Sequence, residues 1–333
     1  MKHGFLTRLL ILLTVICLIL PLAACSPYRL ELSNEKQSAI VMRAGGYDIA
    51  FEVVDFFYHN YKSVIDGGDS SVWEGEDAAL YHEKLLARAI ESACELYAIL
   101  EVSKDFGVDP YGEGIEEQME EGIRAVIDSY KTRREYIEHL TSLHMTDTVY
   151  RLMMRTYLCQ QYLLEYTDGV SSVKDEDLLA FCENENVLNT LCLTVYFEKS
   201  TLPWAKERAA QITAALADVT TDDGFRQVAL QLATAYNSKE METGVYMTLR
   251  EYRRLCGDEN ATLAIGEMTA PIFGTDSFVV LRAIEKDPAI LEKNPEAVRS
   301  CYLEYLIEEK TAVFAEGREM TEIGLALTPD YFD

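Results

Sequence analysis

The hydrophobic periodicity of this chain changes near Asn189, and that change constrains the fold more than any other feature. Before it, apolar residues recur every three or four positions, which is typical of amphipathic helices. One such stripe consists of Leu86, Ile90, Ala93, Tyr97 and Leu100. From Leu191 to Phe197, apolar residues instead alternate with others, which predicts a β-strand. The sequence therefore predicts an α+β fold, with a mostly helical part followed by a smaller mixed part.

The part before Asn189 predicts a short hairpin and then a series of helices. Residues 39–42 and 45–49 form the expected strand and its return, with Gly45-Gly46 at the turn. Gly107, followed by Asp109-Pro110, is a helix C-terminal signal. The helical patterns cover residues 50–65, 86–107, 115–130, 136–143, 148–166 and 175–183.

The part after Asn189 mixes strands and helices. Its patterns predict the order β, α, α, β, helical segment, β over residues 189–286. After Pro288 the sequence is helical again to about Met320, and this helix has no apolar partner of its own nearby. We expect it to pack on the N-terminal helices, which offer the larger apolar faces.

The N-terminus has the pattern of an export signal. Lys2 and Arg8 precede an apolar run of twelve residues, Leu9–Leu20, whereas a helix needs about 20 to cross a membrane. Leu22-Ala23-Ala24-Cys25 then resembles a lipobox, so we expect cleavage before Cys25 and a palmitate-containing lipid on its thiol. An ordinary secretory signal with a chance cysteine is the alternative. The prediction places the protein at the cell membrane, lipid-anchored on the extracytoplasmic face.

Charge and residue spacing exclude several other classes of function. A formal net charge of −26 argues against a nucleic-acid partner. No Cys-x-x-Cys pair occurs, and His139 and His144 are five apart, a spacing that does not stack side chains on a helix, so no metal site is predicted. No cofactor motif is present. The six cysteines after Cys25 are interpreted as small buried thiols, with disulfides as the alternative.

Two stretches resemble a known family of foldases. Phe225 to Ala229, then Ala264 to Ile272 and Phe278 to Leu281, are similar in order and spacing to the parvulin pattern of a helix, a Gly-Glu turn and a closing strand. Upstream, Leu85 to Asp109 with the acidic helices that follow, and Val173 to Asp177, resemble the helical chaperone domain of SurA and PrsA. The chain thus resembles a lipoprotein foldase of the PrsA/SurA type.

This resemblance implies a domain plan and a function. Residues 1–24 would be the signal peptide, 25–38 a tether, 39–187 the helical chaperone domain, 188–287 an inserted parvulin-like domain, and 288–333 the C-terminal helix that completes the helical domain. Such a foldase binds unfolded or nascent exported proteins, is held to the membrane by its lipid, and can form a homodimer.

The resemblance also implies where a prolyl isomerase pocket would lie. Active parvulins carry two histidines on facing strands, and those positions align with Thr194 and Phe278, while Thr234 falls near the family's aspartate or cysteine. All five histidines of the chain precede residue 145, so no shift of the alignment restores one. We therefore predict no catalytic residue and a vestigial pocket. An active peptidyl-prolyl isomerase and a non-catalytic binding or structural lipoprotein are the alternatives.

Overall fold

The computed structural model describes residues 35–65, 70–75, 77–165, 169–198, 201–274 and 276–332. The described chain forms two compact units, a helical unit from residues up to 172 and from 306 onward, and a sheet unit from residues 173–305. The two units are presented separately below. The predicted signal peptide and Cys25 lie outside the described residues.

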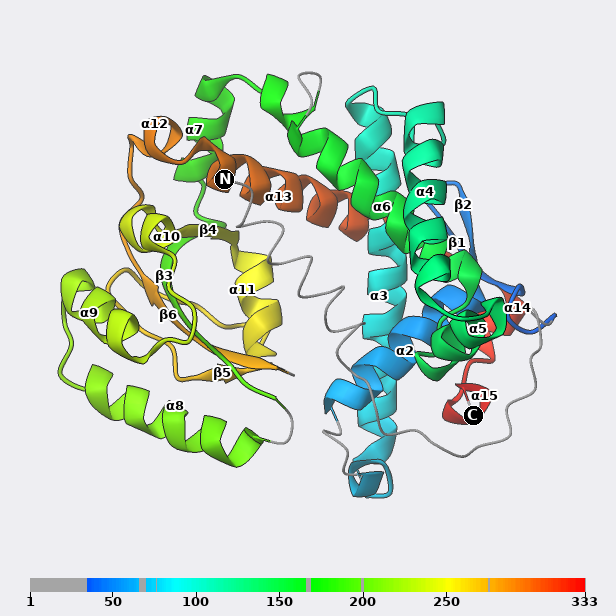
Figure 1. The fold of residues 1–333 in the computed structure, drawn as a ribbon, viewed down its shortest axis with the longest axis horizontal. Helices are drawn as coiled ribbons and strands as arrows, with labels where there is room; N and C mark the ends of the chain where they lie inside the picture. Colours follow the sequence, from blue (N-terminus) through cyan, green and yellow to red (C-terminus); the bar gives the residue numbers. More distant parts are fainter. Residues whose placement is uncertain are drawn as a thin grey trace. The chain divides into compact units, whose positions relative to one another are not determined.

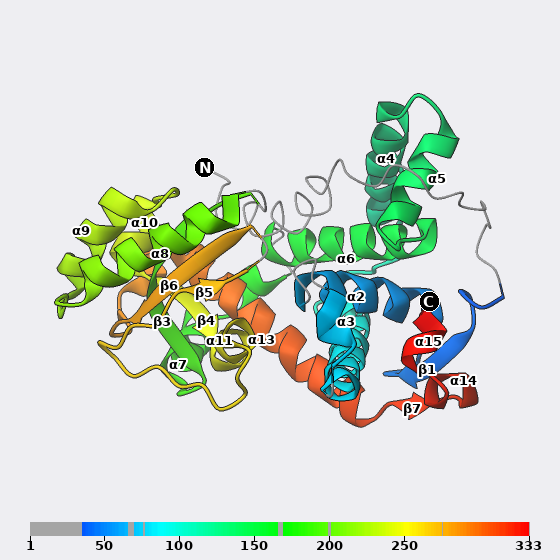
Figure 2. The ribbon, with the colours of Figure 1, turned by 90° about the horizontal axis from the view of Figure 1, so that it is seen from below.

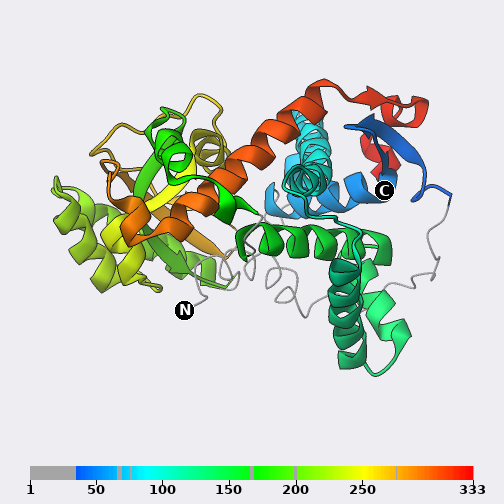
Figure 3. The same ribbon diagram turned by 90° about the horizontal axis from the view of Figure 1, so that it is seen from above.

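A small sheet at the start of the helical unit joins its two ends. Strands β1 (Ile40–Ala44) and β2 (Tyr47–Ala50) form the predicted hairpin. Gly45 and Gly46 turn it with φ of 57° and 83°, as a two-residue turn of this kind requires. The two-residue strand β7 (Glu319–Met320) pairs with the other edge of β1, so the sheet order is β2-β1-β7. Figure 3 shows this C-terminal segment, in red, beside the blue hairpin.

Five of the predicted helical segments form the body of the helical unit. The long helix α3 buries one stripe of small and apolar side chains, and α2 and α6 pack along it. Figure 2 shows α4 lying beside α5. The helices are α2 (Phe51–Ile65), α3 (Ala78–Asp105), α4 (Glu113–Ser129), α5 (Arg133–Ser142) and α6 (Asp147–Glu165), with short 3-10 turns η1 (Ser70–Trp73) and η2 (Val170–Ser172).

The C-terminal residues pack within the helical unit from residue 306 onward. They comprise the second part of α13 (Pro295–Glu316), then α14 (Glu322–Leu325) and α15 (Pro329–Phe332). Ile307 and Phe314 are buried, and the ring of Phe332 stacks on Tyr58 with centroids 3.7 Å apart. This segment therefore contributes core side chains to helices that begin some 250 residues earlier in the chain.

An antiparallel sheet with the order β4-β3-β6-β5 forms the centre of the sheet unit. Its strands are β3 (Val187–Tyr196), β4 (Val245–Thr248), β5 (Ile272–Phe273) and β6 (Ser277–Ala283). Figure 1 shows α8 (Leu202–Leu216) and α9 (Asp222–Leu232) on one side of β3 and β6, and α11 (Leu249–Cys256) on the other. The predicted order of elements is present. The structure also contains α10 (Ser238–Thr243) and β5, which the sequence patterns did not assign, and α11, which they gave only as a helical segment.

Both faces of this sheet are buried by alternate residues of the same strands. Leu191, Leu193 and Val195 point toward α8 and α9, where they meet Phe225 and Phe278. Cys192 and its neighbours on the other strands point the opposite way, toward α11. A sheet covered on both faces carries apolar residues at nearly every strand position.

The sheet unit also includes α7 (Asp175–Glu183), α12 (Ile290–Lys293) and the first part of α13. The domain plan had assigned α7 and all of α13 to the helical part. The physical reason for the difference is a cluster in which Leu178 and Phe181 of α7 and Val298 of α13 pack with Val187 and Tyr246 of the sheet.

None of the described cysteines forms a disulfide. Four of them are buried: Cys94, Cys159, Cys182 and Cys301. Burial raises the pKa of Cys94, Cys159 and Cys182 to about 11, which keeps these thiols protonated and unreactive. The interpretation as small buried thiols is confirmed for these four residues.

Candidate functional site

Two of the three predicted pocket residues, Thr194 and Phe278, occupy neighbouring strands of the sheet unit, but they do not share one surface. Thr194 of β3 lies opposite Val279 of β6, and Val195 lies opposite Phe278. Because successive side chains of a strand point to opposite faces, Thr194 and Phe278 lie on different sides of the sheet. Phe278 is 0% exposed and belongs to the core beneath α8 and α9. The structure therefore does not bring Phe278 into a pocket with Thr194.

Thr234 does lie beside Thr194, through the backbone. Its N–H donates to the Thr194 carbonyl at 3.1 Å, and its hydroxyl accepts from the Tyr196 N–H at 2.6 Å. Strand β4 pairs only with Val187–Thr190, and Thr234-Ala235 continue the same edge of β3 further along. Thr234 thus completes a sheet edge.

The partly exposed strip around Thr194 is the surface that remains of the predicted pocket. Cys192 Sγ and Thr194 Oγ1 lie 3.4 Å apart, and Val279 and Ile272 continue the strip across β6 and β5. Its side chains are a thiol, a hydroxyl and two aliphatic groups. These four side chains offer apolar contact and weak hydrogen bonding.

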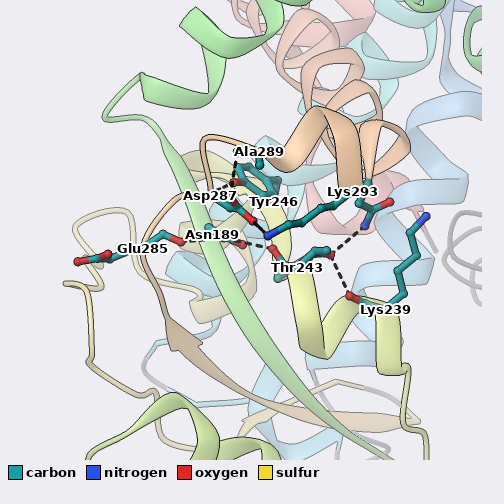
Figure 4. A network of polar contacts seen from close by, with 10 residues as sticks. Asn189, Lys239, Thr243, Tyr246, Glu285, Asp287, Ala289 and Lys293 are labelled. Atoms are coloured by element: carbon teal, nitrogen blue, oxygen red, sulfur yellow. Dashed lines mark hydrogen bonds and ion pairs between the residues drawn. The ribbon is translucent and has the colours of Figure 1, made fainter.

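A buried polar junction on the opposite face was missed by the sequence analysis. Asn189 of β3 is 2% exposed, and its Nδ2 donates to the carbonyls of Glu285 at 3.0 Å and Thr243 at 3.4 Å. Asn294 Nδ2 donates to the Thr243 hydroxyl at 3.1 Å, and that hydroxyl donates to the Lys239 carbonyl at 2.9 Å. Figure 4 shows how these groups converge from β3, α10 and the segment before α13.

Asp287 extends this junction toward α12. Its carboxylate accepts from Lys293 Nζ at 2.6 Å and from the Ala289 N–H at 2.8 Å, and its own N–H donates to the Tyr246 hydroxyl at 3.1 Å (Figure 4). The hydrogen bond from Lys293, followed by the one from the Ala289 N–H, lowers the pKa of Asp287. Burial raises the pKa of Tyr246 to about 12. Both groups keep one protonation state near neutral pH, as expected of a structural contact.

A hollow of about 360 Å³ borders the junction, and its cationic side chains are already bonded. Arg282 is buried and donates to Asp222 Oδ1 at 2.7 Å and to the carbonyls of Gly266 and Thr220 at 2.7 and 2.8 Å. Arg226 donates to the Met241 carbonyl at 2.6 Å. These arginines hold turns and helix ends together, so the hollow is a polar seam of the fold.

Exposed apolar side chains occur at the start of α3 in the helical unit. Leu80 and Tyr81, at the start of α3, are 49% and 38% exposed. The Tyr81 ring meets Trp73 of η1 edge to face, with centroids 6.2 Å apart. We call Trp73, Leu80 and Tyr81 the α3 patch.

Among the described residues, no helix is both long enough and apolar enough to span a membrane.

The comparisons with known proteins find similarity only among solved structures. No family model and no curated protein matches the sequence. The foldase PrsA of Lactococcus lactis is 11% identical with a TM-score of 0.25, over 87% of this chain and 97% of that one. The foldase PrsA of Streptococcus pneumoniae is 15% identical with a TM-score of 0.30, over 88% and 97%. The peptidylprolyl isomerase PrsA of Bacillus anthracis is 16% identical with a TM-score of 0.23, over 67% and 91%. With TM-scores this low, the function has to be argued from the residues of this chain.

Proposed function

We propose that the protein is a membrane-anchored extracytoplasmic chaperone of exported proteins, whose parvulin-like sheet unit lacks prolyl isomerase activity. The observation that carries the proposal is the composition of the strip around Thr194. The motifs of the family surround it in the family's order, yet Thr194 stands where the resemblance places one imidazole, and the other such position, Phe278, lies in the core. A frame without its reactive groups favours a binding role.

Client binding is assigned to the helical unit, at the α3 patch. Exposed aromatic and aliphatic side chains that lie together are typical of surfaces that bind other proteins. An unfolded exported chain offers apolar side chains to such a surface. Because aromatic rings give much contact area with few rotatable bonds, the patch can bind many sequences at a low cost in side-chain entropy.

The acidic charge of the chain supports the same role. A formal net charge of −26 repels other copies of the protein and keeps a complex with an unfolded client in solution. The same field attracts clients that carry basic segments. We expect client binding to weaken as salt screens this attraction.

Anchoring by a lipid on Cys25 is the third part of the proposal, and the motif Leu22-Ala23-Ala24-Cys25 supports it. The test is detergent phase partitioning of the wild type and Cys25→Ala, expressed in a bacterium that processes lipoproteins. The wild type should enter the detergent phase and the variant should not. Identical partitioning into the aqueous phase would refute the anchor.

Suppression of aggregation tests the client site. Purified wild type should suppress aggregation of a chemically unfolded client, measured by light scattering. The Leu80→Ser, Tyr81→Ser double variant should bind that client roughly fivefold more weakly, the equivalent of about 1 kcal/mol. The matched control is Val313→Ser, which changes an exposed aliphatic residue elsewhere on the helical unit. Equal suppression by all three proteins would remove the α3 patch from the proposal.

A further inference from the structure

A cluster of three side chains that can bind a metal ion lies in the helical unit. Asp55 and His59 are four residues apart on α2, so both side chains lie on one face of that helix. Asp55 Oδ1 and His59 Nε2 are 3.4 Å apart. His144 joins them from the turn between α5 and α6, and one donor atom from each of the three residues lies within 4.8 Å of the others.

His144 has a left-handed backbone conformation at this position. Its φ is 51°, and among the described residues it is the non-glycine residue with a positive φ. The Met145 N–H bonds to the Leu140 carbonyl and the His144 N–H to the Thr141 carbonyl, which is the hydrogen-bond pattern that ends a helix with a left-handed residue. Glycine usually occupies that position because a Cβ is strained there. A histidine in its place points to a use for the imidazole.

The imidazoles of His59 and His144 face each other. Their rings stack with centroids 3.7 Å apart and 9° between the planes. His59 Nε2 also contacts the carbonyl of Phe332 at 3.0 Å.

We propose that Asp55, His59 and His144 bind one zinc ion. Two imidazoles and one carboxylate are a ligand set that Zn²⁺ accepts, with a fourth position left for water. Ligand distances of about 2.0 to 2.2 Å place tetrahedral donors roughly 3.4 Å apart. Because an imidazole lone pair lies in the ring plane, one of the two stacked rings has to rotate before both can point a nitrogen at the same ion. The exposed His144 ring supplies most of this movement by tilting out of the stack.

Zinc binding also changes how the C-terminus is held. Coordination through Nε2 replaces the contact of His59 with the Phe332 carbonyl by a bond to the ion. The ion then links α2 to the turn between α5 and α6, two segments far apart in sequence. Since zinc binds this folded arrangement and not the separated segments, it stabilises the helical unit by a free energy that grows with the logarithm of the zinc concentration.

The test is a zinc titration of the full chain in competition with a chromogenic chelator. The wild type should bind one ion per chain, and His144→Asn should bind it roughly tenfold more weakly or worse. Asparagine tolerates the left-handed conformation, so this variant keeps the end of α5. The control is His139→Asn on α5, whose ring packs near Tyr130 outside the cluster and whose loss should leave zinc affinity unchanged.

A second measurement separates the cluster from the cysteines, which also bind zinc. In NMR spectra, zinc should shift the ring proton signals of His59 and His144 and leave that of His139 in place. Equal zinc affinity of the wild type and His144→Asn would overturn the proposal, and so would the absence of binding at micromolar zinc. A variant with normal far-UV circular dichroism and lost binding supports it.

Discussion

The two units of this protein differ in their histidine content. The helical unit holds His59, His82, His139 and His144, with rings that stack on aromatic or imidazole neighbours. The sequence of the sheet unit, residues 173–305, contains no histidine. Its central strands carry apolar residues on both faces, and a large ring, Phe278, fills the core. Among the described residues, imidazole groups therefore belong to the helical unit alone.

The comparison also separates two kinds of polar contact. In the sheet unit, polar groups such as Asn189 and Arg282 bond to backbone carbonyls and hold segments together. In the helical unit, Asp55, His59 and His144 meet near the surface, where an ion can reach them. Contacts of the first kind govern stability, whereas those of the second kind can respond to a ligand.

The largest expected effect comes from removing the C-terminal segment of the helical unit. Deletion of residues 306–333 removes Ile307, Phe314 and Phe332 from the core and β7 from the edge of β1. The free energy of unfolding of the helical unit should fall by roughly 5 kcal/mol or more, because several large side chains lose their partners. Urea unfolding followed by circular dichroism measures this, and an unchanged midpoint would break the assignment of the segment to that unit.

A second prediction concerns Phe278 and sharpens its assignment to the core. Phe278→Ala should destabilise the sheet unit by about 3 to 5 kcal/mol, because it leaves a cavity beneath α8 and α9. Phe273 stacks on Phe278 from β5 but is 43% exposed, so Phe273→Ala should cost only about 1 kcal/mol. Similar losses in the two variants, measured by thermal unfolding, would mean that Phe278 borders a pocket after all.

The polar junction of the sheet unit should show an intermediate effect. Asn189→Ala leaves the carbonyls of Thr243 and Glu285 without their donor, which should cost about 1 to 3 kcal/mol. Asn186→Ala, three residues earlier and exposed, serves as the control and should be nearly neutral. Chemical denaturation of both variants checks this, and equal stabilities would remove the structural role of the junction.

The smallest effect is a pH dependence at Asp287. Its pKa is lowered in the folded protein, so its ion pair with Lys293 stabilises the fold above the unfolded pKa, near 4, and that contribution is lost as pH falls through the folded value. Because the pair is largely solvated, the effect should be small. Asp287→Asn should remove this part of the acid-unfolding curve. A wild-type curve that overlays the curve of Asp287→Asn would contradict the prediction.

The sequence predicted the long periodic elements and missed the short ones. The pattern at 175–183 coincides with α7, and the hairpin predicted at residues 39–42 and 45–49 is present as β1 and β2 with bounds shifted by one or two residues. The two-residue strands β5 and β7 contain too few residues for a period, and β7 forms only because β1, far away in sequence, provides an edge. Such elements depend on the tertiary structure.

The site was harder to predict because strand register decides which residues meet. Phe278 and Val279 are both apolar, so the alternation in β6 does not reveal which residue shares a face with Thr194. The pair Asp55 and His59 was recognisable from its spacing of four. The approach of His144 depends on the left-handed turn that ends α5, and no pattern in the sequence announces that turn at a histidine.

The proposed lack of prolyl isomerase activity can be tested with a client protein whose slow refolding phase is limited by isomerisation of an X-Pro bond. An uncatalysed X-Pro bond isomerises over tens to hundreds of seconds, so even weak catalysis by the full protein is visible as a faster slow phase. If the protein lacks isomerase activity, the slow phase has the same rate with and without it, while aggregation of the client is suppressed. Suppose instead that the wild type accelerates the slow phase, that Thr194→Val does not, and that Phe273→Ala still does. The strip around Thr194 would then be an active isomerase site, which contradicts the proposed lack of isomerase activity.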